Sequence, residues 1–236
     1  MSVNLQLMKK LLFKYILEFI VIVFGITISF YLEKQNAILY KEDLKNESLK
    51  KLRENINQDI EDNLYNLDQH ERAYQASEIL INKGQELYRE DNDSLGYLLV
   101  AAGQISTIFV DNSEEYNALR NSGLIELIDN DLLVSSLQKK YSRHIFLKEF
   151  ERLILNQSSK MNNLIAEKIE ISNKTRLKGQ PVYWSPFKSN EPFLSDKELN
   201  LFFYKGILHG DYSNMIKRSI AADSVILLKI EKEISQ

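Results

Sequence analysis

The sequence predicts an all-α protein: one N-terminal transmembrane helix continues into a long amphipathic helix and an antiparallel helical bundle. Residues 15–32 are almost entirely apolar, and no glycine or proline interrupts the chain between Gly25 and Gly84. Behind the apolar segment, hydrophobic residues recur at the spacing of one helical face. All three prolines lie within residues 173–195, so they break no predicted helix.

The apolar segment, YILEFIVIVFGITISFYL, carries a single acid, Glu18. Its 18 residues reach about 27 Å as a helix, close to the hydrocarbon thickness of a bilayer. Aromatic residues stand near both ends, as in the belts of membrane-spanning helices. No small-residue cleavage site follows. We therefore expect residues 1–32 to form an uncleaved anchor in contact with membrane lipid, and residues 33–236 to form an extramembrane helical-bundle domain.

The orientation of the span depends on the charges that flank it. Three lysines and no acid precede residue 18, and three lysines with four acids occupy residues 33–47. The positive-inside rule counts basic residues and gives a tie. A short basic tail before an uncleaved span usually stays in the cytoplasm. We expect a single-pass protein of the bacterial cytoplasmic (inner) membrane with its domain on the outer side; the opposite orientation stays open.

Four residues of the anchor share one stripe of the helix at 100° per residue: Lys14, Glu18, Gly25 and Ser29. Lys14 can pair with Glu18 one turn later, and Gly25 with Ser29 forms a small-xxx-small pair that lets a second helix approach closely. This pattern predicts a membrane-helix interface and a homo-oligomer. Two alternatives stay open: a carboxyl group wetted by lipid headgroups, and an oligomeric pore or ion-conducting unit lined by Glu18 and Ser29.

The composition excludes several classes of function. The 30 basic and 33 acidic residues are interspersed, which argues against a nucleic-acid partner. The absence of cysteine excludes a thiol nucleophile, a disulfide framework and the common structural zinc sites. The three histidines stand in no catalytic or metal-binding motif. We therefore expect no catalytic residue, cofactor or metal, and a protein that is not an enzyme.

A long helix should leave the membrane and run to about Tyr88, with a break near Tyr40 where the apolar pattern falters. Its apolar face, typical of a core or a coiled-coil seam, is formed by Leu49, Leu52, Ile56, Ile60, Leu64 and Leu67. The carboxylates of Asp59, Glu61 and Asp62 should be solvated. Residues 90–96 should form a turn, and residues 95–110 should be mostly helical.

A structural corner is expected next, formed by Tyr116, Leu119, Ser122, Gly123 and Asn130. A short helix over residues 114–121 should stop at Gly123, which tolerates a positive φ. Asn130 or Asp131 should then cap a helix reaching about Ser172. Its buried face should include Leu133, Leu137, Tyr141, His144, Leu147, Glu151, Ile154, Met161, Ile165 and Ile169.

Residues 173–195 form the one long loop that the sequence predicts, rich in proline and aromatic residues. Tyr183, Trp184 and Phe187 either pin this loop onto the helices or present a surface to a protein partner. After the loop, Asp196 should cap a helix to about Leu208. A break at residues 209–211 should separate it from a last helix over residues 212–234.

Two segments carry a resemblance to a known family. One is the span E-F-I-V-I-V-F-G-I that starts at Glu18, and the other is Y-N-A-L-R-N-S-G-L-I-E-L-I-D-N that starts at Tyr116. They resemble a family of small single-span membrane proteins of unknown function that is common in Bacteroidota. The resemblance covers about residues 1–60 and 112–145, and residues 33–36 depart from it. It implies an integral membrane protein with a helical extramembrane domain, and it brings no activity.

These observations predict a membrane-anchored helical protein that acts by assembly, scaffolding or sensing, through self-association of its span. A pore lined by Glu18 and Ser29 is the alternative.

Overall fold

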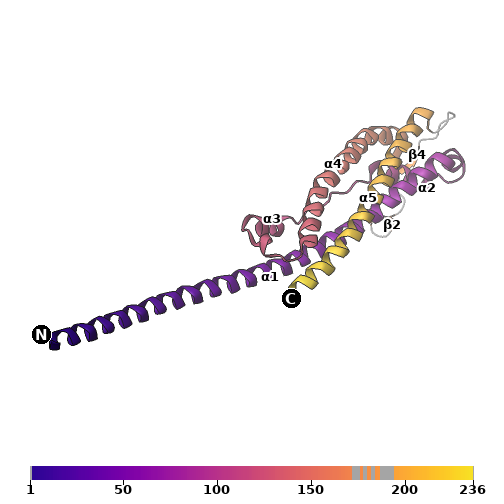
Figure 1. The fold of residues 1–236 in the computed structure, drawn as a ribbon. Coiled ribbons are helices and arrows are strands. Elements are labelled where there is room, and N and C mark those ends of the chain that lie inside the picture. Colours follow the sequence, from indigo (N-terminus) through magenta and orange to yellow (C-terminus); the bar gives the residue numbers. More distant parts are fainter. Residues whose placement is uncertain (1, 172–175, 178–179, 182–183, 187–193, 236) are drawn as a thin grey trace.

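A computed structural model describes residues 2–171, 176–177, 180–181, 184–186 and 194–235. Most of these residues are helical, as the sequence predicts. The helices are α1 (Ser2–Glu90), α2 (Asn92–Gln104), α3 (Glu114–Asn121), the 3₁₀ helix η1 (Leu124–Leu127), α4 (Asp131–Lys168) and α5 (Asp196–Ile234). In Figure 1, the N-terminal part of α1 extends alone as a rod, and the other helices lie along its C-terminal part.

Helix α1 is one uninterrupted helix of 89 residues, so the predicted break near Tyr40 is wrong. At about 1.5 Å per residue it is about 130 Å long. Residues 8–41 are all exposed, and burial begins at residue 42. Neither glycine nor proline occurs near Tyr40, so the backbone hydrogen bonds continue even where the apolar pattern weakens. This helix is long and apolar enough to cross a membrane.

The buried face of α1 repeats with spacings that alternate between three and four residues, as at the a and d positions of a heptad. It comprises Lys45, Leu49, Leu52, Ile56, Asp59, Asn63, Asn66, His70, Ala73, Ser77, Leu80 and Gly84. We call this face the α1 seam. The expected stripe is right as far as Ile56. Beyond it, Ile60 and Leu67 are half-buried and pack against the core, but Leu64 is 52% exposed and Asp59 is fully buried.

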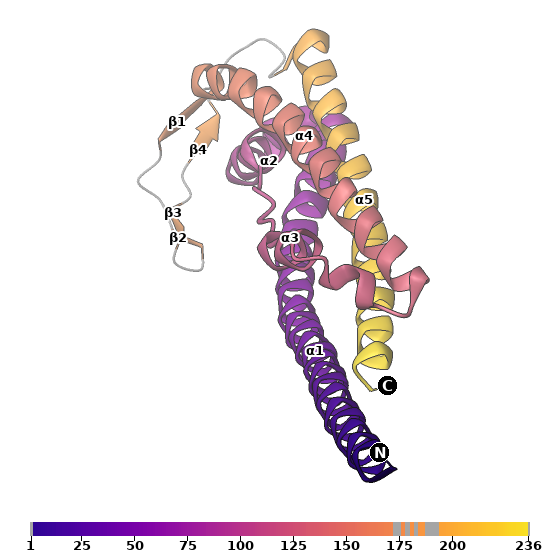
Figure 2. The ribbon, with the colours of Figure 1, turned by 60° about the vertical axis from the view of Figure 1, so that its left-hand side comes forward.

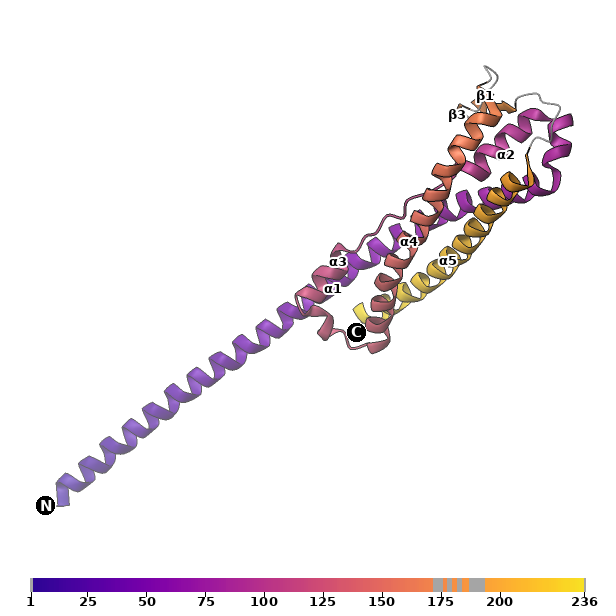
Figure 3. The same cartoon turned by 90° about the horizontal axis from the view of Figure 1, so that it is seen from above.

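Helix α5 packs antiparallel against α1. Lys45 lies beside Glu233, His70 beside His209, and Ser77 beside Gly206. The buried face of α5 has the same alternating spacing: Phe202, Lys205, His209, Tyr212, Ile216, Ser219, Asp223, Ile226, Ile230 and Glu233. Figure 3 shows α4 and α5 alongside α1, with the C-terminus near the point where α1 leaves the other helices.

The start and the continuity of α5 differ from the expectation. Ser195, not Asp196, is the N-cap, and it forms a capping box with Glu198. The predicted break at residues 209–211 is wrong, because α5 continues through it. His209 is buried there, and a Cβ on Gly210 would lie 3.2 Å from Cδ2 of Tyr74. The glycine therefore serves close packing against α1 in place of a helix stop.

Helix α4 follows the corner and packs on α5 with a third face of alternating spacing. That face comprises Leu133, Leu137, Lys140, His144, Leu147, Glu151, Ile154, Ser158, Met161 and Ile165. Most of it matches the predicted stripe. Helix α2 packs on α1 at the end far from the N-terminus. The predicted turn over residues 90–96 is wrong: Asp91 alone separates α1 from α2, and its side chain accepts a hydrogen bond from the Ser94 amide.

Three predicted segments have other conformations. The helix expected up to residue 110 ends at Gln104, and residues 105–113 run between α2 and α3 without regular structure. The helix predicted to reach about Ser172 ends at Lys168, and β1 (Ile169–Ile171) follows it. Within the loop predicted for residues 173–195, β4 (Trp184–Pro186) pairs with β1, and β2 (Arg176–Leu177) pairs with β3 (Gln180–Pro181), both antiparallel. Figure 2 shows these strands to one side, beyond the end of α4.

Two buried glycines make a matched pair for testing the α1–α5 contact. A Cβ on Gly206 would lie 2.9 Å from the Ser77 Cβ, whereas a Cβ on Gly84 would meet nothing within 4 Å. Gly84→Ala should raise stability by about 0.5–1 kcal/mol through lost chain entropy. Gly206→Ala should lower it, because α5 must move away from α1. Thermal unfolding of the detergent-solubilised chain, followed by circular dichroism, measures both. Equal stabilisation by the two variants would contradict the close approach.

Candidate functional site

The four stripe residues of the anchor all lie on the exposed part of α1. The Nζ of Lys14 is 3.8 Å from Oε1 of Glu18, so the two side chains form an ion pair one turn apart. Gly25 and Ser29 lie in a shallow hollow of about 460 Å³ on the helix surface, together with Ile22, Ile26, Phe30 and Glu33. Nothing lies within 4 Å of a Cβ placed on Gly25. The hollow is therefore open to a second helix.

The corner residues lie between α3 and α4. Gly123 has a φ of 74°. The hydroxyl of Ser122 donates to the Leu119 carbonyl at 3.2 Å, which closes the end of α3. The side-chain oxygen of Asn130 accepts from the Leu133 amide at 3.1 Å and so caps α4. These contacts turn the chain sharply between the two helices.

The aromatic ring of Tyr116 holds the corner against α4. It is buried and stacks on the Tyr141 ring with centroids 4.1 Å apart. Two residues of the candidate partner loop, Tyr183 and Phe187, lie outside the described residues. Trp184 opens β4 opposite Ile171, and only its backbone belongs to the described part of the chain.

The structure also places a chain of buried polar side chains along the centre of the helical domain, which the sequence analysis missed. At the end nearest the anchor, the Glu233 carboxylate accepts from the amides of Asp129 and Asn130 at 2.9 and 3.2 Å. Lys45 lies 3.8 Å from the same carboxylate and donates to the Leu127 carbonyl at 3.3 Å. This group ties α1, α5 and the start of α4 together where α1 enters the domain.

A buried ionic triad follows farther along the seam. The Nζ of Lys140 lies 2.8 Å from a carboxylate oxygen of Asp59 and 2.8 Å from one of Asp223. These side chains are 0% exposed and come from α4, α1 and α5. Burial raises the pKa of Asp223, although Lys140 acts against the shift. Asn112 donates a further hydrogen bond to Asp59 at 2.8 Å.

A third group joins α4 to the segment over residues 105–113. Asp111 accepts from Nδ1 of His144 at 2.7 Å and from Nζ of Lys148 at 2.8 Å. Burial acts to raise the pKa of Asp111, but the hydrogen bonds from Lys148 and His144 outweigh it and the pKa is lowered. Burial lowers the pKa of His144. A neutral His144 therefore donates from Nδ1 to an ionised Asp111.

Glu151 is the centre of a fourth group. Its carboxylate accepts from the Tyr212 hydroxyl at 2.5 Å and from the Phe109 amide at 2.8 Å. The hydroxyl of Thr107 donates to it over 3.5 Å. Burial raises the pKa of Glu151, while the hydrogen bond from Tyr212 opposes that shift. One carboxylate of α4 thus accepts hydrogen bonds from both α5 and the segment over residues 105–113.

Two histidines continue this group across the α1–α5 contact. The Nδ1 atoms of His70 and His209 lie 2.7 Å apart, and Nε2 of His70 lies 2.8 Å from the Thr107 hydroxyl. Both histidines are 0% exposed. Burial lowers the pKa of His70 to about 4, with a further contribution from the charge of Lys205. Burial likewise lowers the pKa of His209.

Lys205 ends the chain of polar groups. Its ammonium group is fully buried and donates to the carbonyls of Gly103 and Ile105, at the C-terminal end of α2. A cation at this end of a helix interacts favourably with the helix dipole. Burial nevertheless lowers the pKa of Lys205 to about 7.

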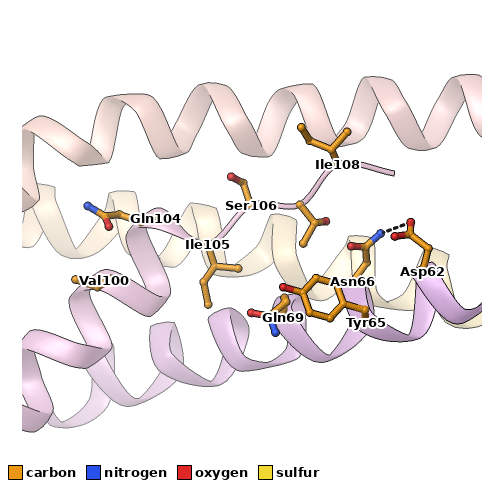
Figure 4. Close-up of a pocket in the computed structure, with 10 residues that line it drawn as sticks. Asp62, Tyr65, Asn66, Gln69, Val100, Gln104, Ile105, Ser106 and Ile108 are labelled. Carbon is orange, nitrogen blue, oxygen red and sulfur yellow. Dashed lines mark hydrogen bonds between the residues drawn. The ribbon is translucent and has the colours of Figure 1, made fainter. Parts of the chain in front are cut away.

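An open groove of about 320 Å³ borders the polar chain. Figure 4 shows it between α1 and the segment that follows α2. Asp62 bridges the two sides: it accepts from the side chain of Asn66 at 3.1 Å and from the Val110 amide at 3.3 Å. The groove is lined by Asp62, Tyr65, Asn66, Gln69, Val100 and residues 104–108. The surface of the groove is mixed in polarity. The Asp62 carboxylate already accepts two hydrogen bonds within the protein, which gives it a structural role.

Comparison of the chain with protein-family models, with curated proteins and with solved structures finds no match. The resemblance to the single-span family therefore stays a prediction. Within the part of the chain that the structure describes, no three histidine, aspartate or glutamate side chains are grouped so that they could hold a metal ion.

The sequence did contain a signal for the buried chain. The spacing of Leu49, Leu52 and Ile56 continues without a break to polar residues: Asp59, Asn63, Asn66 and His70. Continuing the alternating steps would have placed these residues on the seam. Following hydrophobicity instead shifts the stripe by one residue after Ile56. Asp59, which was expected to be solvated, is the residue most affected by this error.

The ionic triad makes a prediction about stability. Lys140→Met should destabilise the domain by about 3–5 kcal/mol, because it leaves two carboxylates buried without their cation. Lys139→Met removes a lysine from the exposed face of the same helix turn and should change stability little. Urea unfolding of both variants in detergent measures the difference. Similar small effects would show that the triad is solvated.

Lys205 makes a prediction about pH. Its folded pKa of about 7 lies below the ordinary value of 10.5, so the unfolded chain binds more protons between these pH values. The stabilisation is fully present above the unfolded pKa and is lost as the pH falls through the folded pKa. Above neutral pH, the unfolding free energy should therefore rise with pH by up to about 1.4 kcal/mol per unit.

Urea unfolding between about pH 7 and 9.5, below the ordinary range of tyrosine, measures this slope. Lys205→Met should abolish it, and Lys197→Met, at an exposed position of α5, should leave it intact. A slope that survives Lys205→Met would assign the proton uptake to another group.

Proposed function

We propose that this protein is a single-pass membrane protein that acts by assembly, scaffolding or sensing through self-association of its span. In this proposal residues 1–32 anchor the chain, and residues 33–236 form a helical bundle outside the membrane. The observation that carries the proposal is the continuity of α1, which leads from the exposed apolar part into the buried seam without a break. A movement of the span would therefore also move the part of α1 that packs against α5.

The exposed apolar surface of α1 supports the membrane assignment. Large hydrophobic side chains between Met8 and Leu32 are 43–68% exposed around the helix. Burial of apolar surface is favourable by about 25 cal/mol per Å². A helix that is apolar all round needs lipid or a partner over its whole length. Lipid meets this need, and the N-terminus is then proposed to be cytoplasmic, with the domain on the outer side of the bacterial inner membrane.

The first test is extraction from membranes. The full-length protein should stay in the membrane pellet after washes with high salt or alkaline carbonate, and detergent should release it. The physical reason is that the span would bury its apolar surface in lipid, whereas salt weakens only electrostatic attachment. Recovery of the protein in the salt wash would refute the anchor.

Gly25 and Ser29 support close approach of a second helix, because their small side chains leave a shallow hollow on the exposed helix surface. The ion pair of Glu18 with Lys14 favours this interface over the alternative of a pore lined by Glu18 and Ser29. A carboxylate neutralised by a neighbour one turn away is less suited to attract a passing cation. The pore stays the second candidate.

Substitutions in the span separate these candidates. Gly25→Leu and Ser29→Leu should weaken self-association more than Ile22→Leu, because only the first two fill the close-contact face. Since the chain has no cysteine, single-cysteine variants along residues 18–29 report the interface by crosslinking. Crosslinks at residues 21, 24 and 28 without any at 18, 25 and 29 would place the interface elsewhere. Ion flux through liposomes that is lost in Glu18→Ala would favour the pore.

A further inference from the structure

The contact between His70 and His209 has room for only one proton. The Nδ1 atoms face each other at 2.7 Å, so one of them must carry a hydrogen and the other must present its lone pair. The two rings come from α1 and α5, at the middle of the seam. Whether this contact holds is therefore set by the number of protons on the pair.

The proton count explains how the contact can fail. In the neutral pair, a single Nδ1 hydrogen bridges the rings. One added proton leaves that bridge in place but puts a positive charge in a fully buried site. A second added proton places two N–H groups face to face at hydrogen-bond distance, which forces the rings apart. Each added proton thus weakens the α1–α5 contact.

The groups that face the pair do not compensate an added charge. On α5, the positive charge of Lys205 acts against a charge on either histidine. Tyr212, also on α5, lies against His70 with ring centroids 4.6 Å apart. Thr107, from the segment after α2, hydrogen-bonds to Nε2 of His70. On α4, Glu151 is the carboxylate that Thr107 connects to the pair.

Two carboxylates, Glu151 and Asp62, lie in the surroundings of the pair. Asp62 of α1 adds negative charge that acts on Glu151 and Tyr212. Because burial raises the pKa of Glu151, falling pH neutralises this carboxylate early. A neutral Glu151 then offers no negative charge to balance an imidazolium. A charged pair is therefore least stabilised under the acidic conditions that produce it.

We propose that the His70–His209 pair is a proton-operated latch, which holds α1 against α5 at neutral pH and releases them, together with the segment over residues 105–109, in acid. The segment follows the pair because Thr107 is hydrogen-bonded to His70 and because Phe109 and Thr107 share the Glu151 carboxylate. Because the pKa values of both histidines are lowered, the stability of the contact falls as the pH falls. The contribution of His70 is present above the ordinary value of 6.5 and is lost as the pH falls through about 4.

This latch would supply a stimulus for the sensing proposed above, and its effect at the membrane rests on that proposal. The two can fail separately. Loss of crosslinking at the span would refute self-association and leave the latch untouched, whereas an acid-insensitive seam would refute the latch and leave self-association untouched.

Histidine NMR on the unmodified full-length chain is the first test. With only three histidines in the sequence, selective isotope labelling in detergent gives few signals, and His144→Gln assigns the third. Two histidines should share one Nδ1 hydrogen and remain neutral well below the ordinary histidine pKa of about 6.5. If either histidine of the pair titrates at or above its ordinary value, the latch is refuted.

Hydrogen exchange is the second test, because it locates the opening. After correction for intrinsic rates, the amides in residues 66–74 and 205–213 and the Phe109 amide, which donates to Glu151, should exchange about tenfold faster or more at about pH 4.5 than at pH 7. Residues 49–56 and 226–230, in the apolar part of the same seam, should stay protected. Equal loss of protection along the whole seam would mean global acid unfolding and would overturn a local latch.

Matched variants assign the opening to the pair. His70→Gln and His209→Gln each remove one titrating ring and should reduce the acid-dependent change of exchange, and the variant that carries both substitutions should abolish it. His144→Gln, in the neighbouring Asp111 group, should keep that change. If His70→Gln and His209→Gln retain the full acid response, or His144→Gln removes it, the latch is assigned wrongly.

Discussion

The domain depends on one constraint: the charged side chains that the three long helices bury must each meet a partner. An apolar seam alone would fix the register weakly, since Leu49, Leu52 and Ile56 could pack against many aliphatic neighbours. The ionic triad does not allow such freedom. If α1 slid by one heptad, Lys140 would lose Asp59 and that carboxylate would stay buried without a cation. Polar side chains at seam positions are a known means of setting register and partner choice.

The same constraint explains which parts of the fold the sequence could predict. The limits of α3, the positive φ at Gly123 and the cap of α4 depend on residues adjacent in sequence, and they were predicted. The seam beyond Ile56 was not, because Asp59 is acceptable inside a protein only if a cation such as Lys140 comes from another helix. Of the candidate site, the anchor stripe and the spacing of the seam could be read from the sequence, whereas the partner of each buried polar group depends on tertiary contacts.

The continuity of α5 shows the same limit from the opposite side. A histidine, a glycine and an aspartate in succession are typical of a helix end, and local propensity favours a break there. In the structure, His209 meets His70 and Gly210 admits the Tyr74 ring. Both residues are used for contact with α1. Tertiary packing therefore outweighs a local stop signal that costs about 1 kcal/mol for a glycine inside a helix.

The arrangement of the polar groups also limits how α1 could carry a signal. A sliding movement along α5 would separate the Lys45–Glu233 group, the ionic triad and the histidine pair at the same time, because all three lie on one seam. A sideways separation can begin at a single group while the apolar part between Lys45 and Asp59 stays closed. Movements of a packed helix pair favour discrete arrangements over continuous ones. The seam thus favours local separation or rigid-body displacement of α1, and it resists a piston-like slide relative to α5.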